Sequence, residues 1–172
     1  MTKSKCTKTI IVLGMPRSFT SVVPGGLSAV GVDMGRYLVG RDFSNPTGHF
    51  ENKAFVDMNK RILTWAGGAW NRLPPREKIL EFPHKDEIKD LVKNCKNEFW
   101  GWKDPRMAAT VELYLPYVDD PIFIVCYRGF EETAQSIARR DRVSIVHARK
   151  IVRGYQKRIS EFLERFYAGE SI

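Results

Sequence analysis

The sequence predicts an α/β layer fold with a parallel sheet, because short apolar strands alternate along the chain with amphipathic helices. Two runs rich in β-branched and aromatic residues, 9–13 and 121–127, are typical of buried strands. The clearest helix is predicted over 144–168, where apolar residues form one stripe that ends before Gly169. There is no internal repeat, and 172 residues fit one domain, 1–172.

The other elements follow in chain order from the same periodicities. A small apolar helix is predicted over 19–30, although Pro24 and two glycines lie inside it. Apolar residues at helical spacing predict a helix over 51–65, with Asn52 or a residue before it as the cap. The remaining predictions are helices over 84–96 and 131–140, a short strand over 98–102, and loops over 44–48 and the proline-containing segment 67–83.

Composition limits the class of protein. The longest apolar runs, 10–15 and 122–127, are far shorter than the ~20 residues of a membrane helix, and the basic N-terminus lacks the apolar stretch of a secretory signal. Cys6, Cys95 and Cys126 are an odd number without close spacing, so we expect no disulfide framework or zinc cluster. We therefore expect a soluble protein of the reducing cytoplasm, without a membrane partner.

The charge balance favours anionic ligands. Lys and Arg outnumber Asp and Glu by 28 to 20, which gives a net charge of +8. Such an excess attracts nucleic acid, phosphorylated or sulfated small molecules, or acidic surfaces, although a basic helix face in solvent has the same composition. No nucleic-acid-binding motif accompanies the charge, so we expect no nucleic acid partner. The three histidines lie far apart and predict no metal site.

The first candidate site follows the first predicted strand. Segment 14–21, Gly-Met-Pro-Arg-Ser-Phe-Thr-Ser, leads from the strand into a helix. Backbone N–H groups and the positive helix end at such a turn suit a bound phosphate, and Arg17 and the hydroxyls add donors. The segment is not a Walker A loop, because Phe19 and Thr20 stand where that motif requires Gly and Lys. Taken alone, such a turn is also an ordinary structural feature.

The second candidate site follows the strand predicted over 121–127. Arg128 comes directly after that strand, and Ser136 lies eight residues later on the next predicted helix. Two helical turns can bring the Ser136 hydroxyl to a phosphate that the guanidinium binds. A strand-capping Arg and an ordinary helix-surface Ser are the alternative interpretation.

Together the two sites resemble the sulfotransferases that use 3′-phosphoadenosine 5′-phosphosulfate. Segment 14–21 is similar to their loop for the 5′-phosphosulfate, and Arg128 with Ser136 is similar to their pair for the 3′-phosphate. The motifs Gly-His-Phe-Glu at 48–51 and Gly-Trp-Lys-Asp-Pro-Arg at 101–106 fit the bacterial and tyrosylprotein-sulfotransferase-like branch. The resemblance covers about 10–140 and implies a three-layer P-loop-like fold with a small central parallel sheet flanked by helices.

The resemblance also implies a reaction: in-line transfer of a sulfuryl group to an acceptor hydroxyl or amine, with 3′-phosphoadenosine 5′-phosphate as product and no metal. Lys103 or Arg17 would stabilise the leaving group, and Glu51, or else His49, would act as base. The donor would be held by Arg17, Ser18, Phe19, Thr20, Ser21, Arg128 and Ser136. The acceptor stays open between small alcohol, carbohydrate, peptide tyrosine and lipid, and so does the oligomeric state.

The sequence departs from the family at two places. Phe19 stands where the family usually has Gly, and Pro24-Gly25-Gly26 replaces residues that usually continue a helix. Two other functions therefore stay open. One is a P-loop-like kinase of a nucleotide or small molecule, which the missing Walker Lys and the lack of an obvious Mg²⁺-binding Asp disfavour. The other is a degenerate relative that binds anions without catalysis.

Overall fold

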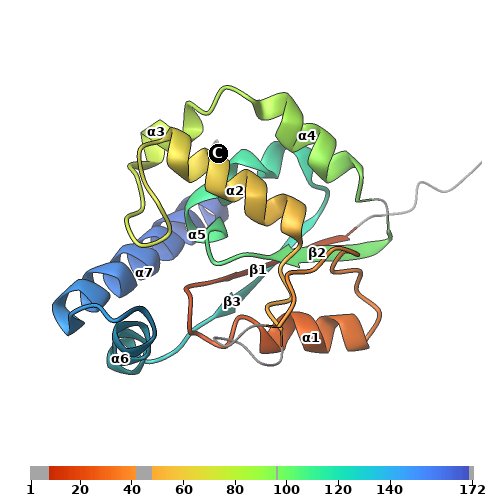
Figure 1. Cartoon of the computed structure of the whole chain (residues 1–172). Coiled ribbons are helices and arrows are strands. Elements are labelled where there is room, and N and C mark those ends of the chain that lie inside the picture. The colour runs from red at the N-terminus through yellow and green to blue at the C-terminus, as the bar shows by residue number, and fades with distance from the viewer. Residues whose placement is uncertain (1–7, 42–47, 96, 171–172) are drawn as a thin grey trace, which may run out of the picture.

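A three-stranded parallel sheet lies at the centre of the computed structural model, which describes residues 8–41, 48–95 and 97–170 (Figure 1). The strands are β1 (Lys8–Gly14), β2 (Phe99–Lys103) and β3 (Pro121–Cys126), in the order β2-β1-β3. Helices flank the sheet and make up 51% of the structure. The α/β class, the three predicted strands and their parallel pairing are confirmed, and the arrangement is compatible with a three-layer fold.

The register brings the carboxyl ends of the strands to one edge. Val12 of β1 lies opposite Lys103 of β2, and Gly14 lies opposite Cys126 of β3. The segments that follow the three strands therefore leave the sheet side by side. In open parallel sheets this is the edge at which ligands bind.

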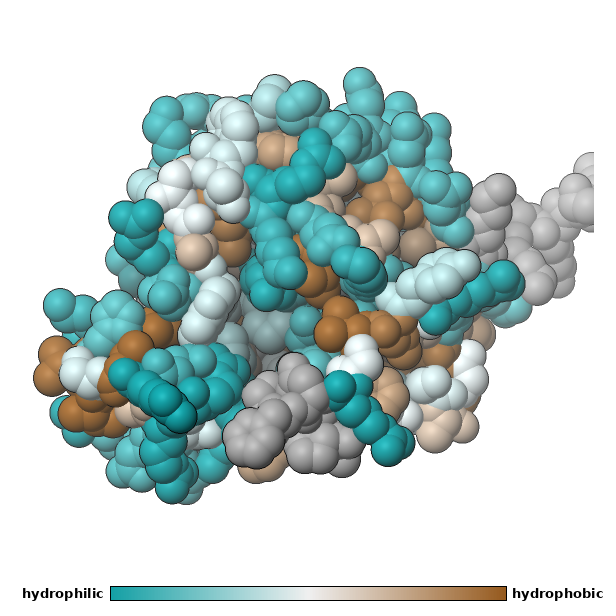
Figure 2. All heavy atoms as spheres, in the orientation of Figure 1, coloured by the Kyte–Doolittle hydropathy of each residue, from teal (hydrophilic) through white to brown (hydrophobic). Residues whose placement is uncertain are grey.

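Side chains of β1 point alternately to the two faces of the sheet, so the strand contributes to the apolar core on both faces. Ile11 and Leu13 pack with Trp100 and Trp102 of β2 under four helices: α2 (Lys53–Trp65), α4 (Lys85–Lys93), α5 (Met107–Thr110) and the C-terminal part of α7 (Ile145–Tyr167). Ile10, on the opposite face, packs with Leu27 of α1. Figure 1 shows this division, with α2 and α4 on one side of the sheet and α1 on the other. Figure 2 shows that mostly hydrophilic side chains cover the outside of this view, with smaller apolar areas between them.

Most of the predicted helices are confirmed with small shifts of their ends. Asn52 caps α2, because its Oδ1 accepts a hydrogen bond of 3.0 Å from the Ala54 N–H. Pro24 is compatible with α1 because the helix begins at Val22, which places the proline in the first turn. The helices are α1 (Val22–Ala29), α2 (Lys53–Trp65), α3 (Arg76–Leu80), α4 (Lys85–Lys93), α5 (Met107–Thr110), α6 (Phe130–Asp141) and α7 (Ile145–Tyr167).

Two segments differ from the sequence prediction. The predicted loop 67–83 contains α3, whose Ile79 is buried and whose Arg76 binds Glu112 through Nε at 2.8 Å. No helix was predicted over 107–117, which holds α5 and the 3₁₀ turns η1 (Val111–Leu113) and η2 (Leu115–Tyr117). Both segments are short, and burial of their apolar side chains stabilises them.

The predicted loop 44–48 lies outside the described residues except for Gly48. Within the described ranges, no helix is long and apolar enough to cross a membrane.

Candidate functional site

The loop after β1 turns sharply back on itself. A Cβ on Gly14 would overlap the Thr20 side chain, so the loop returns close to the end of the strand. Arg17 and Phe19 have φ of 72° and 60°, in the left-handed region that non-glycine residues rarely adopt. The loop then enters α1 at Val22, so its backbone N–H groups and the positive helix end lie at one place.

The structure brings the two candidate sites together. The Arg17 Nε donates a hydrogen bond of 2.9 Å to the Ser136 hydroxyl on α6, 119 residues away. Arg128, after β3, donates from Nη1 to the Arg17 carbonyl at 3.2 Å and lies over the Phe19 ring at 5.0 Å. Its Nε also pairs with Glu132 at 3.2 Å. Arg17, Arg128 and Ser136 therefore form one cluster, in which Ser136 contacts Arg17.

A third arginine, Arg140, adds positive charge close to this loop. Burial lowers the pKa of the Arg17 guanidinium from its ordinary value, and the nearby cations Arg140 and Arg128 lower it further. Arg140 pairs with its neighbour Asp141 at 2.7 Å and stacks on Trp70 at 5.1 Å. Because the surroundings of Arg17 disfavour its charge, a bound anion would stabilise this cluster.

A cavity of about 210 Å³ lies in front of the loop. It is bounded by the segments that follow all three strands, as the register requires, and by the chain that leads into α2. Most of the predicted site residues meet here. Its lining residues are Pro16, Arg17, Phe19, Thr20, Ser21, Val22, His49, Glu51, Lys103, Pro105, Arg128 and Arg140.

A buried ion pair forms the floor of this cavity. The Lys103 Nζ, at the end of β2, lies 2.7 Å from the Glu51 Oε1 and 3.4 Å from the Ser21 hydroxyl. The Lys103 side chain is 2% exposed and that of Glu51 11%. Arg106 approaches the second Glu51 oxygen at 3.9 Å. The Glu51 carboxylate is thus held in a fixed position beside the loop after β1, and His49 lines the same cavity.

Asp104 and Arg106, in the segment that follows β2, form an ion pair. Asp104 is fully buried, and its carboxylate accepts hydrogen bonds from the Arg106 Nη1 at 2.7 Å and the Asn59 amide at 2.9 Å. Asn59 in turn accepts hydrogen bonds from the Thr110 and Tyr114 hydroxyls at 2.7 and 2.8 Å. This network fixes the direction in which the chain leaves β2, and thereby the position of Lys103.

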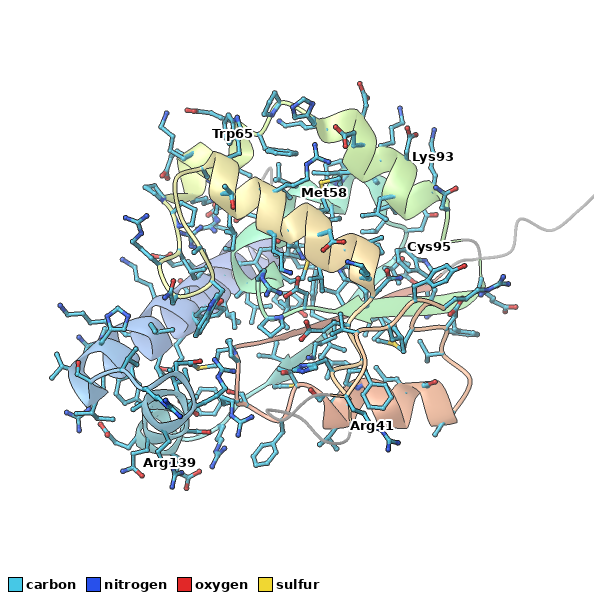
Figure 3. The ribbon with its side chains drawn as sticks, viewed as in Figure 1. Arg41, Met58, Trp65, Lys93, Cys95 and Arg139 are labelled. Atoms are coloured by element: carbon cyan, nitrogen blue, oxygen red, sulfur yellow. The ribbon has the colours of Figure 1, made fainter. Side chains whose placement is uncertain are left out.

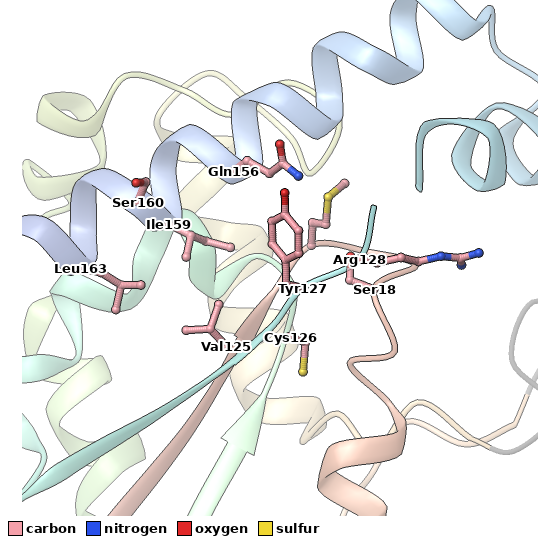
Figure 4. Close-up of a pocket in the computed structure, with 10 residues that line it drawn as sticks. Ser18, Val125, Cys126, Tyr127, Arg128, Gln156, Ile159, Ser160 and Leu163 are labelled. Carbon is pink, nitrogen blue, oxygen red and sulfur yellow. The ribbon is translucent and has the colours of Figure 1, made fainter. Parts of the chain in front are cut away.

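Ser18 is placed differently from its neighbours in the loop. Its side chain lines a second cavity of about 220 Å³, between the end of β3 and α7, instead of the one that Arg17 faces. Figure 4 shows Tyr127 and Gln156 pointing toward one another across this cavity, while the Arg128 side chain extends away from it. The Ser18 hydroxyl and the Gln156 Nε2 are buried without a hydrogen-bond partner among the described residues.

A third cavity of about 380 Å³ adjoins the first and shares Pro16, His49, Glu51, Pro105 and Arg140 with it. It extends to Trp70 and to Tyr155 of α7. The sequence analysis missed these two aromatic residues and Arg140. Arg140 lies one helical turn after Ser136, so its spacing already placed it on the same side of the predicted helix. The sequence indicated Trp70 only as a core or pocket-wall residue and Tyr155 only as part of the apolar stripe of its helix, because their place beside this cavity depends on how α7 crosses the fold.

Comparisons with protein-family models, with curated proteins and with solved structures found no match for this chain. Within the part of the chain that the structure describes, no three His, Cys, Asp or Glu side chains are grouped to hold a metal ion.

Proposed function

We propose that this protein is a sulfotransferase that moves a sulfuryl group from 3′-phosphoadenosine 5′-phosphosulfate to an acceptor hydroxyl or amine. The proposal rests on one observation: two groups of charged side chains lie together in one cavity. Three guanidinium groups surround the loop after β1, and a buried carboxylate–ammonium pair lies beside them. Cations suit the phosphates of such a donor, and the carboxylate suits deprotonation of an acceptor. The proposal includes a P-loop-like relation of the strand–loop–helix unit and cytoplasmic activity.

The residues present fit such a donor. Arg17, Thr20, Ser21 and the loop N–H groups would hold the 5′-phosphate, next to the start of α1. Arg128 and Ser136 would hold the 3′-phosphate, and binding would exchange their contacts with Arg17 for contacts with phosphate oxygens. The lowered pKa of Arg17 supports this assignment, because a dianion relieves the repulsion between neighbouring guanidinium groups.

The chemistry requires one proton transfer and one displacement. The acceptor oxygen forms a bond to sulfur while the bond from sulfur to the 5′-phosphate oxygen breaks, which leaves the bisphosphate. Glu51 accepts the acceptor proton, with His49 as the second candidate. Lys103 holds the Glu51 carboxylate in place, and Lys103 and Arg17 offset the negative charge that develops on the leaving phosphate.

The first test is ligand-dependent thermal unfolding. Wild type is heated with 3′-phosphoadenosine 5′-phosphate, with AMP, or with ATP and Mg²⁺. The same measurements are made on Arg128→Ala and on the control Arg153→Ala, which lies on the exposed side of α7. A ligand at 100 times its Kd adds about 2.7 kcal/mol, which gives a clear rise in Tm. The proposal expects the largest rise with the bisphosphate, lost in Arg128→Ala alone. A larger rise with ATP and Mg²⁺ would support a kinase, and no rise with any nucleotide would disprove the donor site.

The second test assigns the base. Glu51→Gln keeps the shape of the side chain and a hydrogen-bond acceptor for Lys103 but cannot take up the proton. Bisphosphate release from the donor is followed with a panel of phenols and sugars as acceptors. We expect Glu51→Gln to lower kcat by about 10²–10⁴ and to keep the bisphosphate-dependent rise in Tm. His49→Gln is the matched variant, and a larger loss there would assign the base to His49.

A further inference from the structure

The cavity beside Glu51 has a neighbour along α7 with which it shares two lining residues. The cavity of about 380 Å³ described above ends at Trp70 and Tyr155, and the same two side chains line a cavity of about 300 Å³ beyond them. We call the two together the long groove. Each is as large as the smaller ligand pockets of proteins, so the groove exceeds what a small alcohol fills.

One face of α7 forms a wall of the outer cavity. Lys150, Ile151, Gly154 and Tyr155 come three, four, seven and eight residues after His147, so all five lie on one side of the helix. Trp70 and Leu73, from the segment between α2 and α3, form the other wall. The aromatic rings, Leu73 and Ile151 give this part of the groove an apolar lining that suits an aromatic or alkyl group.

A buried polar atom lies in this wall. The Tyr155 side chain is fully buried, and its hydroxyl has no hydrogen-bond partner among the residues that the structure describes. A buried hydroxyl without a partner costs about 1–3 kcal/mol. Tyr155 borders both halves of the groove, but its hydroxyl is closed off from them, so its role there is to support the wall.

The outer end of the groove is basic. Of its lining residues, Arg72 and Lys150 carry positive charge, His147 can do so, and none is acidic. All three are exposed. Arg72 donates to the Gly67 carbonyl at 3.1 Å, which leaves its charge without a carboxylate partner in the described structure. In the inner half, by contrast, Arg140 is paired with Asp141. The positive charges without a carboxylate partner in the described structure, those of Arg72 and Lys150, therefore lie at the end of the groove far from Glu51.

We propose that the long groove binds the acceptor, and that the acceptor is an elongated hydroxyl compound with an aromatic or alkyl body and an acidic end group. This inference rests on the proposed function, which places the reacting hydroxyl at Glu51. The body lies along Trp70 and Leu73, and the carboxylate, phosphate or sulfate at the other end lies near Lys150 and Arg72.

Binding of a graded series of probes tests the class of acceptor. The probes are ω-(4-hydroxyphenyl)alkanoates with two to eight chain carbons and their primary amides, titrated by calorimetry with and without 3′-phosphoadenosine 5′-phosphate. We expect the longer acids to bind about twofold to fivefold more tightly than their amides, the preference that one exposed ion pair provides. Lys150→Gln is expected to remove most of this preference, and Lys157→Gln, which changes a cation outside the groove, is expected to keep it.

Gly154 allows the groove to be filled without strain. A Cβ at this position meets nothing within 4 Å, so Gly154→Leu places its side chain in the outer cavity. We expect Gly154→Leu to weaken the long acids at least tenfold and to leave 4-methylphenol unchanged. Gly154→Ala, the matched control, keeps the cavity open, and alanine is the better helix former.

The outcomes separate this inference from the proposed function. Equal affinity of acids and amides, no binding of any probe, or unchanged affinity in Gly154→Leu would overturn the assignment of the groove, even if the bisphosphate binds. Absence of bisphosphate binding, with the acids still bound and still sensitive to Lys150→Gln, would overturn the sulfotransferase proposal and leave an acid-binding groove.

Discussion

At the scale of the residue, Phe19 holds a backbone conformation that suits glycine. Its φ of 60° is left-handed, and its ring is 61% exposed beneath the Arg128 guanidinium. The loop therefore keeps the turn that the resemblance assigns to glycine, at the cost of backbone strain. The aromatic ring offsets part of that strain through its contact with the cation.

We predict that Phe19→Gly and Phe19→Ala will differ in stability. Both remove the ring, but only alanine keeps the left-handed strain, which costs about 1–2 kcal/mol. The free energy of unfolding in urea should therefore be about 1 kcal/mol higher for Phe19→Gly, after allowance for glycine's flexibility in the unfolded chain. Equal values, or a more stable alanine variant, would mean that the loop relaxes out of this conformation.

Cys95 gives a prediction about pH. Burial raises the pKa of the Cys95 thiol from 9.0 to about 11. Because the folded pKa is above the unfolded one, the stabilisation from this thiol is complete below pH 9 and is lost as pH rises through about 11. At pH 8 alkylation of Cys95 should be about 100-fold slower in the folded protein than in urea, as peptide mass spectrometry can measure. Equal rates would contradict the buried position.

At the scale of the element, the pairing of β1 with β2 depends on a glycine. A Cβ on Gly101 would overlap the carbonyl oxygen of Ile10, its register partner. We predict that Gly101→Ala lowers the free energy of unfolding by about 2–4 kcal/mol, because backbone must move to admit the methyl group. Urea denaturation measures this, with Gly154→Ala as the variant in open space. A loss below 0.5 kcal/mol would show that β2 shifts freely.

The elements also show what the sequence could predict. The three strands were predictable because each is a short apolar run followed by a break, and the long stripe of α7 was predictable from its period. The segment 107–117 was not, because turns of three or four residues have no period to detect. Pro74 and Pro75 favoured a loop, but Pro75 serves as the N-cap of α3, and the contact of Arg76 with Glu112 stabilises the helix from outside.

The candidate site was predictable in part. The motifs after the strands named the loop, Lys103 and Arg128, and parallel pairing brings those strand ends together. The partner of each side chain was not predictable, because it depends on rotamers and helix positions. Ser136 contacts Arg17, and Ser18 faces a different cavity from Thr20.

At the scale of the whole molecule, net charge should set the salt dependence of donor binding. The chain carries +8, and Arg139 extends outward from α6 (Figure 3), where its charge contributes to lowering the pKa of Arg17. We predict that the Kd of 3′-phosphoadenosine 5′-phosphate rises roughly tenfold between 50 and 500 mM KCl, because salt screens this field. Isothermal titration at several salt concentrations measures the slope. A Kd independent of salt would contradict a site built from charged side chains.

The position of β1 in the sheet has a consequence for biosynthesis. β1 is central in space but first in sequence: Lys8 pairs with Phe99, and Thr9 with Pro121. During translation about a hundred residues are added after this apolar strand before its partner strands are made. Contacts so far apart in sequence also form slowly. The nascent chain therefore exposes this apolar strand until both partner strands have been made, and we expect its yield to depend on chaperone supply and translation rate.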